Sequence, residues 1–456
     1  MQIRRLISKL NNKHFFSLAG NGLMSVFAIA TMWMLFHFLP DIAEVGNWVF
    51  FQTVYNLVDM FRTGFLTTAT IKFYSGTDKD RGAEVIGSCW VLATLITAGL
   101  MVLNVPALLL VGMVKTPGLA FFLKWFGLTY LLSLPTVVAN CVLQAEGRFD
   151  RLLYMRAVTQ GSFLLSMLLF VLLHHFTLEA VVISNLLSYF AASVFVLIKG
   201  WAKIGAWRRK TAAGIKQLYD FGKYSVGGNI SSYLLRVSDI FIIGFMFPGK
   251  TGEGLVAIYN FGLRLLEIVE IPLRSFVATA MPSLATAYNK GNKAEVIYIM
   301  KKYAGTLTMA LIPVAVISVC LADIAVYIIG GPNLKGEAGI EAANVLRLFM
   351  TFALLFPTDR FLALSLDVIH KPDVNFVKIL IMLAANVTGD IVGILVSHSI
   401  YGVAITTVFP TLIAVFIGYR ALRKYEPFHL RDIYATGFAE AKILVRNTLK
   451  FRSSVS

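Results

Sequence analysis

The residues best suited to chemistry in this sequence are charged side chains inside two long apolar stretches, 224–247 and 255–286. These residues are Arg236, Asp239, Arg264, Glu267, Glu270 and Arg274. A charged side chain is costly in hydrocarbon, so each must face a partner or a water-filled cavity. Arginine suits phosphate groups, because its planar guanidinium makes paired hydrogen bonds with them. The carboxylates are candidates for binding a coupling cation.

Helical geometry, at about 100° per residue, places many of these residues on common faces. Arg264, Glu267 and Arg274 share one stripe, with Glu270 at its edge. Asn229 falls on the same side of its stretch as Arg236 and Asp239. Three further stretches contribute polar faces, and their candidate residues are Asn21 in 15–39, Asp59 and Arg62 in 48–71, and Arg347 in 339–366.

The same charges also have a purely structural interpretation. Arg236–Asp239 and Arg264–Glu267 are spaced i,i+3, and Glu270–Arg274 is spaced i,i+4. Each pair could therefore neutralise itself within one helix. For any single residue both interpretations stay open, and Asp59 and Glu267 are either a shared structural device or an ion site.

The stretches that carry these residues are typical of a membrane protein. The chain has 456 residues, of which 57% are hydrophobic and 14% are charged. A soluble protein is about half apolar and a quarter charged. Apolar runs without two-residue alternation predict helices rather than a barrel. We therefore expect an all-α integral membrane protein of about twelve spans: 15–39, 48–71, 85–112, 119–143, 152–173, 177–198, 224–247, 255–286, 303–329, 339–366, 374–396 and 400–422.

The basic residues predict the orientation of these spans. With the amino terminus inside, the inside segments carry 30 Lys and Arg residues and the outside segments carry 3. This distribution follows the positive-inside rule and predicts that both termini are cytoplasmic. The net charge of +16 is thus explained by topology, and we do not expect nucleic acid as a partner.

An internal repeat divides the chain. Ser17-Leu-Ala-Gly-Asn21 recurs 208 residues later as Ser225-Val-Gly-Gly-Asn229, and Asp59 falls on Glu267 at the same shift. Six spans in each half give both halves the same orientation, so the repeat is parallel. We expect a first bundle over 1–210 with a basic linker, a second over 211–423 and a basic cytoplasmic tail over 424–456. The tail is either an amphipathic helix on the anionic leaflet or a frayed polar end.

Several chemistries are not indicated by the sequence. It has no Walker loop, no zinc-spaced His and Cys set and no nucleophile elbow, so we expect neither an enzyme nor a cofactor or metal site. Cys89, Cys141 and Cys320 form no spacing motif and are interpreted as small buried hydrophobes. Asp323, Asp359 and Asp390 are interpreted as solvated residues near the ends of spans.

Three short motifs carry a resemblance to a known family: Ser231-Ser-Tyr-Leu-Leu-Arg-Val-Ser-Asp239, Ile258-Tyr-Asn-Phe-Gly-Leu-Arg264 and Leu143-Gln-Ala-Glu-Gly147-Arg148. The first two are similar to spans 7 and 8, and the third to a cytoplasmic loop, of the polysaccharide-transport branch of the multidrug/oligosaccharidyl-lipid/polysaccharide exporter superfamily. The resemblance implies two six-helix bundles and alternating access without ATP hydrolysis. By matching spans, it also carries over Arg62, Arg236, Arg264 and Arg274 as cavity residues.

That branch contains Wzx-type flippases of O-antigen and capsule units. The resemblance therefore implies a multi-pass protein of the bacterial plasma membrane that moves an undecaprenyl-diphosphate-linked oligosaccharide from the inner to the outer leaflet. Expected partners are this anionic lipid, membrane lipids and, as candidates, a polysaccharide polymerase and glycosyltransferases. The alternatives are a cation-coupled multidrug exporter of the same superfamily, or a non-transporting scaffold for polysaccharide enzymes.

Overall fold

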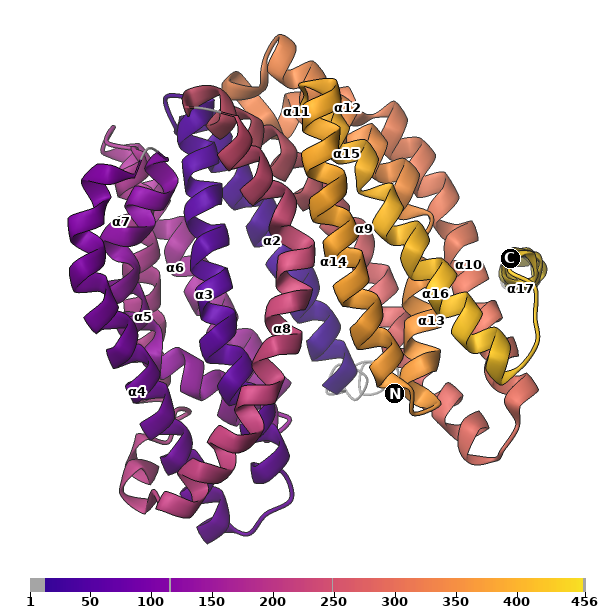
Figure 1. Cartoon of the computed structure of the whole chain (residues 1–456), viewed down its shortest axis with the longest axis horizontal. Helices are drawn as coiled ribbons and strands as arrows, with labels where there is room; N and C mark the ends of the chain where they lie inside the picture. The colour runs from indigo at the N-terminus through magenta and orange to yellow at the C-terminus, as the bar shows by residue number, and fades with distance from the viewer. Residues whose placement is uncertain (1–12, 115, 248, 454–456) are drawn as a thin grey trace. The chain divides into compact units, whose positions relative to one another are not determined.

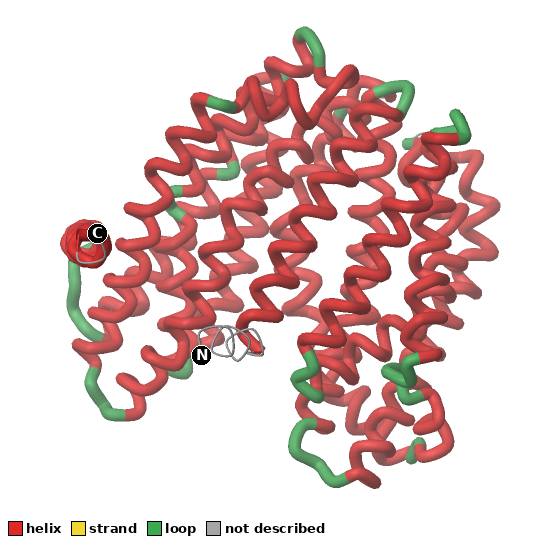
Figure 2. The backbone as a smooth tube through the Cα atoms, turned by 180° about the vertical axis from the view of Figure 1, so that it is seen from behind, coloured by secondary structure: helices red, strands yellow, loops and turns green. Residues whose placement is uncertain are grey.

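The computed structural model describes residues 13–114, 116–247 and 249–453 of the chain. Side chains are described from Gly22 to Ile443, apart from those of residues 115, 224, 248, 275 and 278, and again at Arg446. Every regular element among these residues is a helix (Figures 1 and 2). In the part of the chain that the structure describes, eight helices are long and apolar enough to cross a membrane, and there are nine spans if one bent pair counts as a single span. The chain is a multi-pass membrane protein of the all-α class.

The predicted apolar stretches all coincide with helices. The first seven are α2 (Lys13–Phe38), α3 (Ile42–Tyr74), α4 (Lys79–Leu110), α5 (Pro117–Ala145), α6 (Phe149–Leu172), α7 (Leu178–Ile198) and α8 (Ala212–Met246). The rest are α9 (Gly249–Asn289), α10 (Lys293–Cys320), α11 (Ala322–Gly330), α12 (Glu337–Ala353), α13 (Phe356–Val368), α14 (Pro372–Ser397), α15 (Ile400–Thr406) and α16 (Val408–Tyr425). The count of twelve spans and the cytoplasmic position of both termini stay predictions.

Three of the predicted spans are broken into two helices. The stretch 339–366 bends by 44° between α12 and α13, where Pro357 occupies the first turn of α13. Proline has no N–H to donate inside a helix but is tolerated in the first turn, so the chain restarts there as a new helix. The stretch 303–329 divides into α10 and α11, and 400–422 divides into α15 and α16.

The described chain divides into two compact units. The first comprises Met1–Ala257 with Ile329–Asn333, and the second comprises Ile258–Ile328 and Leu334–Ser456. Helix α8 belongs to the first unit because it packs along α3. The sequence instead assigns 211–423 to the second bundle on the basis of the repeat, and this division stays a prediction.

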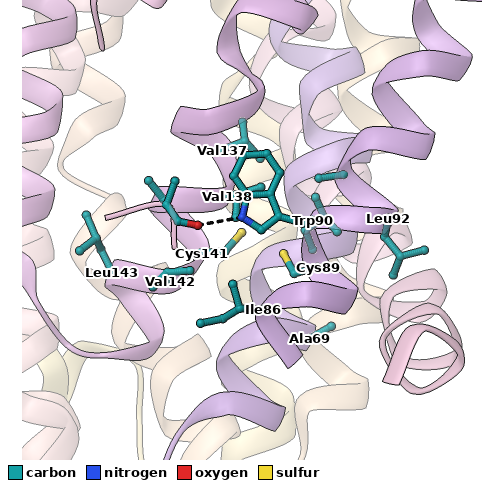
Figure 3. Packing of buried hydrophobic residues seen from close by; sticks show 14 of the residues in the cluster. Ala69, Ile86, Cys89, Trp90, Leu92, Val137, Val138, Cys141, Val142 and Leu143 are labelled. Atoms are coloured by element: carbon teal, nitrogen blue, oxygen red, sulfur yellow. Dashed lines mark hydrogen bonds between the residues drawn. The ribbon is translucent and has the colours of Figure 1, made fainter. Parts of the chain in front are cut away.

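The core of the first unit lies between α4, α5 and the linker after α7. The Trp90 indole N–H donates to the Ala202 carbonyl at 2.8 Å, which ties the linker to α4 (Figure 3). Cys89 and Cys141 are fully buried in this cluster, as expected for small hydrophobes, whereas Cys320 is exposed. The linker also forms the short helix η2 (Ile204–Arg209), which packs on α4.

The tail is part of the second unit. Residues Arg431–Ser453 form helix α17, which packs against α10. Ile433 is fully buried, and the tail is therefore not a frayed polar end. Gly305 of α10 and Gly437 of α17 meet backbone to backbone, since a Cβ at Gly437 would lie 2.1 Å from the Gly305 carbonyl carbon.

Candidate functional site

Arg62 is the most deeply buried of the candidate cations, with no exposed side-chain surface. Its Nη2 lies 2.7 Å from the Asp59 Oδ1, and its Nε donates to the same oxygen. Nη1 donates to the Tyr130 carbonyl at 2.9 Å and faces the Thr97 hydroxyl, while Nη2 also donates to the Ser133 hydroxyl at 2.8 Å. These contacts use all five N–H groups of the guanidinium.

Arg62 therefore has no N–H left for a substrate phosphate. Its contacts instead join α3 to Thr97 of α4 and to Ser133 of α5, three neighbouring helices of the first unit. The Tyr130 ring covers the guanidinium, with its centroid 5.0 Å away. In this structure Arg62 holds Asp59 and links three helices to one another, and its role as a cavity residue stays a prediction.

Helix α8 carries a different arrangement. Asp239 is buried, with 4% of its surface exposed, whereas Arg236 is exposed. Among the described residues, no hydrogen bond or ion pair involves Arg236, so the predicted Arg236–Asp239 pair is not formed. Asn229 is half-buried beside α3, where a Cβ on Gly64 would lie 2.8 Å from its Nδ2. Toward the described part of the chain, Arg236 thus has all its hydrogen-bond donors unused.

Helix α9 presents two ion pairs on its surface. Arg264 Nη1 lies 3.1 Å from Glu267 Oε2, and both side chains are more than a third exposed. Arg274 Nη2 lies 3.0 Å from Glu270 Oε2, and the arginine side chain is 48% exposed. Within the described part of the chain, each arginine makes one hydrogen bond, and most of its N–H groups remain open to a ligand.

Arg347 is tied into the second unit. Its Nη2 lies 2.6 Å from the Asp323 carboxylate, its Nη1 donates to Asn344 at 2.9 Å, and its Nε donates to the Val319 carbonyl. The Asp323 side chain is 68% exposed, as expected for a residue near the end of a span. Arg347 therefore joins α12 to α10 and α11.

The second unit contains a buried carboxylate that the sequence interpretation placed in solvent. Asp390 of α14 has no exposed surface, so its interpretation as a solvated residue is wrong. It accepts hydrogen bonds from Asn386 Nδ2 at 3.0 Å and Thr406 Oγ1 at 3.2 Å. Thr406 belongs to α15, which approaches α14 closely because Gly393 and Gly402 face each other.

A second buried pair lies nearby in the sequence. Lys378 Nζ of α14 is 2.7 Å from Asp359 Oδ1 of α13, and the lysine side chain is 4% exposed. Asp359 is 19% exposed, so it too is less solvated than expected. The signal that could have found these residues is the i,i+4 spacing of Asn386 and Asp390 in an apolar helix, the spacing that puts two side chains on one face.

The structure thus groups the candidates within each unit. Asp59 and Arg62 form one buried cluster in the first unit, and Arg264, Glu267, Glu270 and Arg274 follow one another along α9 in the second. The side chain of Asn21 lies outside the described residues. No group of three or more His, Cys, Asp or Glu side chains that could hold a metal ion occurs among the residues searched.

The arrangement of helices matches solved membrane transporters. A multidrug resistance MATE family transporter of the MOP superfamily, inward-facing, is 15% identical, with 93% of this chain and 99% of that one covered at a TM-score of 0.73. Lipid II flippase MurJ, in an inward closed conformation, is 15% identical. The match covers 96% of this chain and 92% of that one, at a TM-score of 0.74. A MOP superfamily transporter from Pyrococcus furiosus is 16% identical, and the match covers 90% of this chain and 94% of that one, at a TM-score of 0.62.

The helical fold is therefore one that solved MOP-superfamily transporters share. The sequence identifies the chain further: a family described as polysaccharide biosynthesis protein matches residues 41–335, which is most of its length, and the chain belongs to that family. No curated protein sequence matches the chain.

Proposed function

We propose that the protein is a flippase that moves a lipid-linked anionic oligosaccharide from the inner to the outer leaflet of the bacterial plasma membrane. The substrate is an undecaprenyl-diphosphate carrying an O-antigen, capsule or exopolysaccharide unit, and the motion is alternating access. Membership of the polysaccharide biosynthesis family and a fold shared with a lipid II flippase support this proposal. The family description favours a substrate used in polysaccharide synthesis.

The observation that carries the proposal is the state of the arginines on α8 and α9. Arg236, Arg264 and Arg274 expose their guanidinium groups and keep open N–H donors, in contrast to Arg62. An arginine facing hydrocarbon costs about 2.5–3.5 kcal/mol at the centre of a span, so these side chains require water or an anionic ligand. A diphosphate supplies several acceptor oxygens for such groups.

The ion pairs on α9 suit a ligand that arrives and leaves. Glu267 and Glu270 neutralise Arg264 and Arg274 while no phosphate is bound. An exposed ion pair contributes about 0–1 kcal/mol, whereas a hydrogen bond to a charged group contributes about 1.5–3 kcal/mol. A diphosphate can therefore compete for the arginines without a large structural cost.

Energy for transport would come from an ion gradient or the membrane potential. The candidates for coupling are the carboxylates Asp59, Asp239, Glu267 and Glu270, to which the structure adds Asp390. Asp239 and Asp390 are the most buried, with 4% and 0% exposed. Burial disfavours an uncompensated carboxylate charge, so a buried carboxylate is suited to binding a proton or a cation. This favours Asp239 and Asp390 over Glu267 and Glu270, whose side chains are 38% and 19% exposed.

Reconstituted transport tests the proposal. We expect purified protein in liposomes to flip a fluorescent undecaprenyl-diphosphate oligosaccharide, and Arg264→Gln with Arg274→Gln to lower the flipping rate by about tenfold or more, since each lost contact is charge-assisted. Arg81→Gln is the matched control, because Arg81 forms an i,i+3 pair of similar exposure with Glu84. Equal rates in the double variant and the control would remove the α9 arginines from the site.

A cation-coupled multidrug exporter is the second candidate, because the chain shares its fold with a multidrug transporter. In that case a strain lacking the protein becomes drug-sensitive while its surface polysaccharide stays normal, and liposomes do not flip the glycolipid. Flipping by the purified protein would reject both this candidate and a non-transporting scaffold for polysaccharide enzymes.

A further inference from the structure

Helix α17 is attached to the second unit along one face only. Ile433 and Gly437 are buried against α10, and Glu440 receives hydrogen bonds from Tyr298 at 2.7 Å and Lys302 at 2.8 Å. The bonds from Lys302 and Tyr298 hold the pKa of Glu440 below its usual value, so the carboxylate stays charged at neutral pH. Glycine contact, apolar burial and an ion pair together fix the orientation of the helix about its own axis.

The axis of α17 runs across the membrane-spanning helices of its unit. In Figures 1 and 2, which are opposite views, α17 is seen end-on while α10, α14 and α16 are seen from the side. Because the spans cross the bilayer, a helix at a large angle to them lies along the membrane plane. Residues 426–430 join it to α16, whose last turn carries Arg423 and Lys424.

The face of α17 that is turned away from α10 is basic and apolar together. Arg431, Lys442 and Arg446 are exposed on it, and so is Phe438, at 64%. Ile443, 52% exposed, lies at the side of this face, about 140° from Phe438 around the helix axis. At about 100° per residue, Arg431 and Lys442 project within about 40° of Phe438. Glu440 is turned toward α10, where it meets Tyr298 and Lys302, and Asp432 is half-buried at the side of the helix, where it accepts a hydrogen bond from the His429 backbone N–H at 2.9 Å.

We propose that this face of α17, formed by Arg431, Phe438, Lys442 and Arg446 with Ile443 at its side, binds the headgroups of anionic phospholipids at the membrane surface. The apolar side chains enter the boundary between headgroups and acyl chains, and the long basic side chains reach the lipid phosphates. Five residues separate this helix from the end of a span, so the membrane surface is its nearest partner.

The charge balance favours a lipid over a soluble protein as the occupant. Three cations beside two exposed apolar side chains match a surface that is anionic outside and apolar beneath. Each basic residue near an anionic bilayer contributes about 1 kcal/mol, which is about a fivefold preference for the anionic lipid. The preference is electrostatic, so it weakens as ionic strength rises.

A label on α17 in the full-length protein tests the proposal. Ala435 is exposed on the same face, so Ala435→Cys in a Cys320→Ser background gives one accessible thiol, because Cys89 and Cys141 are fully buried. The protein is reconstituted in bilayers that contain either spin-labelled phosphatidylglycerol or spin-labelled phosphatidylcholine, and quenching of a fluorophore on that thiol is measured. We expect phosphatidylglycerol to be enriched at the label by at least about fivefold at low salt.

Charge-removing variants complete the experiment. Arg431→Gln, Lys442→Gln and Arg446→Gln together should abolish the enrichment. Lys199→Gln, Arg208→Gln and Lys216→Gln, which remove the same charge from exposed sites of the first unit, should preserve it. Equal quenching by both lipids in the unmodified helix overturns the proposal. Absence of quenching by either lipid overturns it too, and would assign the face to a soluble partner.

Discussion

Removing Arg62 should destabilise the first unit far more than removing any arginine of α9. The substitution Arg62→Leu deletes a side chain with no exposed surface and leaves Asp59, only 18% exposed, without its cation. The contrast with Arg264 is sharp, because that arginine is 39% exposed and its carboxylate partner is 38% exposed. Solvent can rehydrate Glu267 but cannot reach Asp59 to the same extent.

The size of the effect follows from the groups that lose their partners. The Tyr130 carbonyl keeps a hydrogen bond from the Ser133 hydroxyl at 3.1 Å, so the substitution does not leave this carbonyl without a donor. The cost therefore comes mainly from the Asp59 carboxylate, and breaking a buried ion pair on one side costs about 3–5 kcal/mol. Replacing both partners by apolar residues is close to neutral, so Arg62→Leu with Asp59→Leu should recover most of the loss.

Thermal unfolding of the unmodified protein, Arg62→Leu, Asp59→Leu and the double variant measures these effects. For a unit of this size, about 1 kcal/mol shifts Tm by about 2–4 °C, so Arg62→Leu should lower Tm by roughly 6–20 °C. Arg264→Leu, the matched control, should lower it by less than about 4 °C, because an exposed pair contributes about 0–1 kcal/mol. A double variant at Arg62 and Asp59 that is as unstable as Arg62→Leu would refute the assignment of the cost to the stranded carboxylate.

Two further predictions concern the second unit. Asp390→Asn should keep the fold while uncoupling flipping from ion gradients, measured as the rate in liposomes with and without a gradient; unchanged gradient dependence would exclude Asp390 from coupling. Gly305→Ala should detach α17, because the new Cβ would lie 2.0 Å from the Ile433 carbonyl oxygen, at a cost of about 1–3 kcal/mol. Limited proteolysis of residues 426–430 should then accelerate, whereas Gly227→Ala, where a Cβ meets nothing within 4 Å, should leave it unchanged.

The membrane fold was predictable because hydropathy acts on whole segments. A run of about twenty apolar residues must become a helix in hydrocarbon whatever its neighbours are, so each predicted stretch coincides with a helix. The breaks were less predictable. Pro357 explains the bend between α12 and α13, but proline also occurs inside α4 at Pro106 and inside α10 at Pro313 without ending either helix. Tertiary packing decides between a kink and a break.

The tail illustrates a different limit. Its alternation of basic and apolar residues predicts an amphipathic helix but does not identify what the apolar face packs against. That partner is α10, and the decisive residues are Gly305 and Gly437, which allow the two backbones to touch. Glycine contacts between distant segments leave no periodic signal in the sequence, so such a crossing was not foreseeable.

The charges inside the spans show why the i,i+3 pattern could not separate structure from function. Asp59–Arg62 and Arg264–Glu267 have the same spacing and similar chemistry, yet one guanidinium is fully buried and the other is more than a third exposed. The difference comes from residues far away in the chain: Thr97, Tyr130 and Ser133 supply acceptors around Arg62. No corresponding acceptors surround Arg264 within the described residues. An intramembrane arginine is thus a candidate for substrate binding only where its neighbours leave donors unused, and on α8 and α9 they do.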